Sequence, residues 1–91
     1  MLTDHLLHWL QIKLVADRRP DDAAAQDTVD FFAQVLQEEH GVDIEALSYR
    51  VEENVIHVYY VQAGQRKWHM FSRDAAEQLW RAVETEPRYG Q

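Results

Sequence analysis

The chain has 91 residues and no cysteine, and its formal net charge is −7 because 16 acidic residues outnumber 9 Lys and Arg. A chain of this length holds one hydrophobic core, so we expect a single domain over residues 1–86 and a flexible C-terminal tail over residues 87–91. The lack of cysteine excludes disulfides, thiolate catalysis and zinc–thiolate sites. With no leader and no long apolar run, the sequence predicts a cytoplasmic protein that does not enter a membrane.

The first predicted element is a helix that Thr3 caps, with Asp4 in its first turn. It ends between Asp17 and Pro20. Apolar residues recur at helical spacing around so much of its circumference that we expect burial on more than one side. These residues are Leu6, Leu7, Trp9, Leu10, Ile12, Leu14 and Val15.

A second helix is predicted to begin after Pro20, where Asp21 and Asp22 place negative charge at the positive end of the helix dipole. Gly41 supplies the left-handed residue that a Schellman cap needs, so this helix is expected to end at His40. Its polar side faces solvent or a partner and carries Asp27, Asp30, Gln34, Gln37 and Glu38.

From Leu47 onward the apolar residues alternate with a period of two, which predicts strands over residues 47–51, 55–61 and 65–71. Asp74 followed by Glu77 forms a capping-box pattern that begins a last helix. The predicted fold class is therefore α+β, a two-layer ααβββα domain in which a three-stranded antiparallel meander packs against helices.

The number of residues in each hairpin loop decides which side chains share a face of the sheet. A two-residue turn at Glu53 and Asn54 gives three apolar cross-strand pairs, which are Val51 with Ile56, Tyr49 with Val58 and Leu47 with Tyr60. This agreement fixes the expected register of the first hairpin.

The second hairpin allows two registers. A two-residue Ala63–Gly64 loop forces Ala63 into a costly backbone region and aligns Val58 with His69 and Tyr60 with Lys67. A three-residue loop over residues 62–64 instead places Gly64 at the left-handed position of a G1 bulge. We predict the three-residue loop, since it adds Trp68 and Met70 to the apolar face of the first hairpin.

On this register the other face of the sheet has no helix to cover it, unless the first helix wraps around it. It would hold Arg50, Val55, His57, Tyr59, Val61, Lys67, His69 and Phe71. Aromatic and Arg side chains are enriched in interface cores. The predicted partner-binding residues are therefore Arg50, His57, Tyr59, Val61, Lys67, His69 and Phe71.

The same register sets His57 opposite His69, and two imidazoles on adjacent strands can reach one metal ion. The pair lacks a third nearby ligand, because His5, His8 and His40 belong to helices expected elsewhere. We therefore predict no metal and no cofactor. A small-ligand or metal-binding protein that uses His57 and His69 remains the alternative function.

Other functional classes have weaker support. His5 and His8 with Asp4 form only a thin acid–base group, and the chain has no nucleophile–base set, glycine-rich phosphate loop or HExxH motif, so we predict no enzyme. A basic, aromatic strip on the sheet resembles the chemistry of single-stranded RNA readers, but the net charge makes nucleic acid an unlikely partner. The sequence predicts a small acidic regulatory module that binds a protein partner or a second copy of itself.

Overall fold

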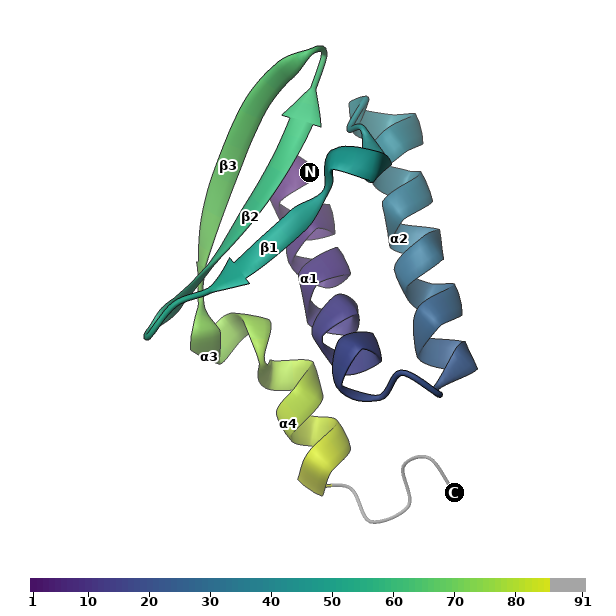
Figure 1. The fold of residues 1–91 in the computed structure, drawn as a ribbon, viewed down its shortest axis with the longest axis vertical. Helices are drawn as coiled ribbons and strands as arrows, with labels where there is room; N and C mark the ends of the chain where they lie inside the picture. The colour runs from purple at the N-terminus through teal and green to yellow at the C-terminus, as the bar shows by residue number, and fades with distance from the viewer. Residues whose placement is uncertain (86–91) are drawn as a thin grey trace.

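The computed structural model describes residues 1–85 and confirms the predicted α+β fold. The elements are α1 (Leu2–Arg18), α2 (Ala23–His40), the short 3₁₀ helix η1 (Ile44–Ala46), β1 (Ser48–Val51), β2 (Val55–Gln62), β3 (Gln65–Ser72), α3 (Arg73–Ala76) and α4 (Gln78–Thr85) (Figure 1). The expected tail over residues 87–91 and the domain end at residue 86 lie outside the described residues. Within residues 1–85, no helix is both long and apolar enough to cross a membrane.

Helix α1 is the centre of the helical layer. It lies beside α2 along its length and contacts α3 and α4 on another side (Figure 1). Its buried residues lie around most of its circumference, which confirms the expected burial on more than one side. The predicted Thr3 cap is wrong, because the helix begins at Leu2 with Met1 at the cap position and without a side-chain cap bond. Asp4 does lie in the first turn.

Helix α2 has the two ends that the sequence predicted. The Asp22 carboxylate accepts a hydrogen bond from the Ala25 amide, which satisfies one of the free N–H groups of the first turn. At the other end Gly41 has a φ of 66°, and the Val42 amide donates to the Leu36 carbonyl at 3.1 Å. These bonds form the Schellman cap, and the helix ends at His40.

The sheet is an antiparallel meander in the order β1-β2-β3. The register predicted for the first hairpin is confirmed, because Val51 pairs with Ile56 and Tyr49 pairs with Val58. Ile56 and Val58 are fully buried against the helices. This face of the sheet is therefore the core face.

The register predicted for the second hairpin is wrong. Gln62 pairs with Gln65, so the loop contains only Ala63 and Gly64, with φ angles of 53° and 75°. Positive φ at both central residues is the pattern of a type I′ turn, whose twist matches that of the flanking strands. The local cost of a left-handed Ala63 is smaller than the gain from this match. A one-residue shift exchanges the two faces of β3.

The C-terminal helical segment begins two residues earlier than predicted. Ser72, not Asp74, caps it, and the Ser72 hydroxyl accepts a hydrogen bond from the Ala75 amide at 3.1 Å. Asp74 lies inside the first turn and pairs with Arg81. The segment is interrupted at Glu77, between α3 and α4, so the predicted Asp74 capping box does not form.

We predict that Ala63→Asn stabilises the protein by about 0.5–1 kcal/mol, because Asn tolerates the left-handed conformation better than Ala does. Urea unfolding measures the change. Ala63→Val is the matched control and should destabilise the protein, since a β-branched residue is strained at positive φ. If neither variant changed the free energy of unfolding, Ala63 would not occupy a type I′ turn.

Candidate functional site

One face of the sheet is open. Helix α1 packs on the core face, where the Tyr49 hydroxyl donates to the Asp17 carboxylate at 2.7 Å and the Trp9 and Tyr49 rings lie 6.4 Å apart. The opposite face has no helix of the described chain over it (Figure 1). Its side chains, given by the register, are Ser48, Arg50, Val55, His57, Tyr59, Val61, Arg66, Trp68, Met70 and Ser72.

The largest apolar side chains of this open face lie together. Tyr59 is directly opposite Trp68, and His57 is directly opposite Met70. Trp68 is 58% exposed, Met70 is 51% exposed and Tyr59 is 37% exposed. We call Tyr59, Trp68, Met70 and His57 the sheet patch. Arg50 and Arg66 lie at its edges.

The sheet patch is held in place by its own contacts. The indole Nε1 of Trp68 donates a hydrogen bond to Nδ1 of His57 at 2.8 Å. The His57 ring is nearly parallel to those of Tyr59 and Trp68, at centroid distances of 6.2 Å and 6.3 Å. Because Nδ1 accepts this bond, neutral His57 carries its proton on Nε2, which faces Glu52 at 3.9 Å. Contacts within the sheet therefore restrict the exposed rings.

Four of the seven predicted partner-binding residues lie on the open face. They are Arg50, His57, Tyr59 and Val61.

The other three are on the core face, because the β3 register differs from the prediction. Phe71 pairs with buried Ile56 and is itself buried, and His69 packs against the Phe71 ring at 4.6 Å. Lys67 lies near the tip of the hairpin, where its ammonium donates to the Gln62 side chain. The predicted placement of these three residues on the open face was wrong.

The register also separates the proposed metal pair. His57 pairs with Met70, and His69 pairs with Val58, so the two imidazoles are on opposite faces of the sheet and cannot bind one ion. In the described part of the chain, no three His, Cys, Asp or Glu side chains are grouped closely enough to hold a metal. His5 instead hydrogen-bonds His40 at 2.8 Å, joining α1 to α2.

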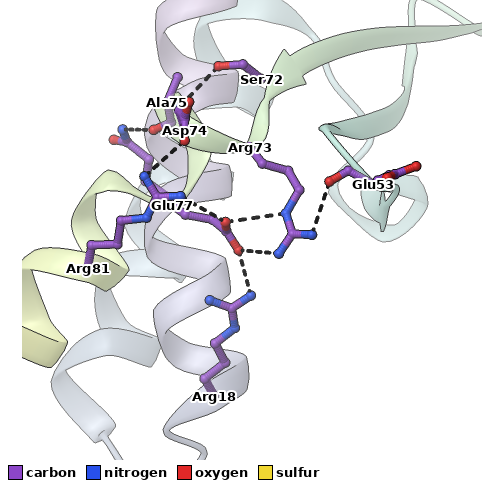
Figure 2. A network of polar contacts seen from close by, with 9 residues as sticks. Arg18, Glu53, Ser72, Arg73, Asp74, Ala75, Glu77 and Arg81 are labelled. Atoms are coloured by element: carbon purple, nitrogen blue, oxygen red, sulfur yellow. Dashed lines mark hydrogen bonds and ion pairs between the residues drawn. The ribbon is translucent and has the colours of Figure 1, made fainter.

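A second polar group, which we call the Glu77 cluster, lies at the other end of the molecule and consists of Arg18, Arg73, Glu77 and Arg81 (Figure 2). The Arg73 guanidinium contacts both oxygens of the buried Glu77 carboxylate, at 3.1 Å and 3.3 Å. Arg18 of α1 donates to the same carboxylate at 3.0 Å, and Arg81 lies 3.6 Å from it. The cluster therefore fastens the C-terminal helices to α1.

The Glu77 cluster borders an open hollow of about 320 Å³ that Glu53, Asn54 and Asp74 also line. Hydrogen bonding from Arg73 lowers the pKa of Glu77; burial opposes this effect and Arg18 adds to it. Glu77 therefore stays ionised at neutral pH and is a poor proton donor. The arginines that contact Glu77 are themselves held in ion pairs with its carboxylate, so the cluster stabilises the fold.

The pKa of Tyr49, at the junction of α1 and the sheet, is also shifted, but upward. Burial, together with the hydrogen bond to Asp17, raises the pKa of Tyr49 to about 12. The phenol is therefore protonated under ordinary conditions and acts as a hydrogen-bond donor. It is a structural link and does not supply a base.

Sequence reasoning missed Trp68 and Met70, which are the most exposed members of the sheet patch. The available signal was Gly64, because Gly readily takes the positive φ that the second central residue of a two-residue hairpin loop needs. Ala63 disfavours this loop, since Ala is not favoured at positive φ. The apolar character of β3 could not decide the register, because one face holds Trp68 and Met70 while the other holds Phe71 beside His69.

No protein-family model, curated protein or solved structure matches this chain. Its candidate site therefore has to be judged from geometry and chemistry alone. On those grounds the sheet patch is the strongest candidate, because it is apolar, contiguous and uncovered, whereas the Glu77 cluster is internally paired.

We predict that Glu77→Gln destabilises the protein by about 1–3 kcal/mol at pH 7, because it leaves several guanidinium groups without their carboxylate. Glu84→Gln, an exposed change on α4, is the matched control and should have little effect.

The effect of Glu77→Gln should also depend on pH. The pKa of Glu77 is lowered in the folded state, so its contribution is present above the unfolded value and is lost as pH falls through the folded value. The difference between wild type and Glu77→Gln should be constant near neutral pH and should shrink below about pH 4. Urea unfolding from pH 7 to pH 3 measures it. A difference that did not shrink would mean that the Glu77 charge contributes nothing.

Proposed function

We propose that this protein is a small, non-enzymatic interaction module that binds another protein surface through the sheet patch. The observation that supports this most directly is the exposure of Trp68, Met70 and Tyr59 side by side on a sheet face that no described helix covers. Apolar side chains scattered singly over a surface are ordinary, but a contiguous group on an uncovered sheet face marks an interaction site.

The residue types of the sheet patch suit a protein partner. Trp, Tyr, Met and Arg are enriched in interface cores, and Trp and Tyr often supply most of the binding energy. The bond between Trp68 and His57 restricts the indole before binding, so a partner loses less side-chain entropy when it docks. This preorganisation supports a role of the sheet patch in binding a partner.

The charges around the sheet patch argue against nucleic acid as the partner. Among the described residues of the open face, the cationic side chains are Arg50 and Arg66, and Arg50 lies 3.4 Å from Glu52. Stacking on Tyr59 and Trp68 would need several more phosphate contacts to overcome a net charge of −7. A protein partner with an apolar surface does not face this cost.

We predict that Trp68→Ser weakens partner binding by about 10-fold or more, because it removes a central aromatic anchor. Phe31→Ser on α2 is the matched control, since Phe31 is 59% exposed and Trp68 is 58% exposed. The measurement is recovery of proteins from the native host on immobilised wild type and on each variant. A specific partner should be retained by wild type and by Phe31→Ser and lost with Trp68→Ser.

The fold of each variant is checked by urea unfolding. Because Trp68 is exposed, its loss should change the free energy of unfolding by no more than about 1 kcal/mol, the size of a cross-strand pair. If every retained protein bound Trp68→Ser as well as it bound wild type, the sheet patch would not be the binding surface.

A further inference from the structure

We infer that a second copy of this chain can occupy the sheet patch, so that two copies stack their open sheet faces about a two-fold axis with their strands antiparallel. This inference rests on the proposed function, because it names one partner for the same surface. It depends on three features of the described residues: the distribution of charge over the fold, the positions of Arg66 and Glu52, and the size of the open face.

The negative charge of the chain lies away from the open face. Residues 21–45, which include α2 and its flanks, contain no Lys or Arg and carry Asp21, Asp22, Asp27, Asp30, Glu38, Glu39, Asp43 and Glu45. In Figure 1, α2 is on the far side of α1 from β3. Two copies that meet through their sheets keep these acidic helices apart, whereas contact through α2 would bring like charges together. Electrostatics therefore favours the sheet as the surface of self-contact.

The two ends of the open face carry opposite charges. Arg66 lies at the Ala63–Gly64 end, and among residues 1–85 it has no ion-pair partner. Glu52 lies at the opposite end, next to the turn at Glu53 and Asn54. It contacts Arg50 and is 41% exposed.

These positions decide between two orientations of the stacked sheets. If the two-fold axis runs along the strands, each Arg66 lies over the same end of the other sheet, so both Arg66 side chains are at one end of the stack. If the axis runs across the strands, each Arg66 lies over the end that carries Glu52 of the second copy. In the second orientation each Arg66, on β3, lies at the end of the stack where Glu52 of the other copy follows β1, so opposite charges meet twice, as a closed symmetric dimer requires. This orientation agrees with the near-aligned packing of sheets face to face.

The open face is small. Strands about 4.8 Å apart with a rise of about 3.3 Å per residue give it a projected area of roughly 300–400 Å². This places the pair among small interfaces, which form weak and reversible complexes. The dimer should therefore be a minor species at low concentration and should grow as the protein is concentrated.

The first test is sedimentation equilibrium of the full chain from about 10 μM to about 1 mM, a range that covers weak association. We expect reversible dimerisation that Trp68→Ser weakens by about 10-fold or more and Phe31→Ser leaves unchanged. A wild type that stayed monomeric throughout would overturn the inference, while the host-protein recovery experiment would still decide the proposed function. Self-association that Trp68→Ser did not weaken would place the dimer contact elsewhere and would also overturn it.

The second test determines the orientation by charge reversal. In the antiparallel dimer, Glu52→Arg and Arg66→Glu each replace two attractive contacts by two repulsive ones, so each variant alone should dimerise about 5- to 30-fold more weakly. A mixture of the two variants should restore association, because every contact then joins opposite charges. The double variant in one chain should also dimerise like wild type.

The other orientation gives a different result. If like ends face each other, the single reversals exchange one repulsive pair for another and leave dimerisation nearly unchanged. Single variants with wild-type association would therefore overturn the antiparallel arrangement, even if Trp68→Ser had established that the sheet patch is used.

Discussion

The two-residue turn at Ala63 and Gly64 is the constraint on which the surface of this protein depends. Both residues adopt positive φ, and the turn sets β3 in register with β2. With one more residue in the loop, Trp68 and Met70 would enter the core, and Phe71 would face outward. The exposed patch is therefore a direct consequence of backbone geometry at the far end of the hairpin, and a mildly strained alanine maintains it.

The open face also depends on how the helices are distributed. Helix α1 is buried on several sides, so α2 and the C-terminal helices can pack against it without crossing to the other face of the sheet. The Glu77 cluster holds α3 and α4 to the end of α1, and the Tyr49–Asp17 bond holds the sheet to the same helix. All described helices are consequently on one side, which leaves the second face of a two-layer fold without a cover.

Local signals made much of the fold predictable. Asp22 and Gly41 determine the ends of α2 through bonds within a few residues, and the first hairpin was predictable because each alternative pairing would oppose polar and apolar residues. The register of strand β3 was not predictable, since both of its faces carry large apolar side chains. The choice between the two registers depended on the energy of one turn. The role of Glu77 was also hidden, because its partner Arg18 is 59 residues away in the sequence. Four of the seven predicted partner-binding residues lie on the open face because they belong to β1 and β2, whose register was predicted correctly.

A weak self-contact and partner recognition can use one surface without conflict. A small face gives a dimer that dissociates readily, so at low concentration most sheet patches are free to bind. A partner that also contacts the hairpin end near Arg66 would bury more surface area than a second copy can bury. By mass action that partner displaces the dimer. At high concentration, the proposed self-association would cover Trp68 and Met70 and so limit non-specific contact of an exposed apolar surface.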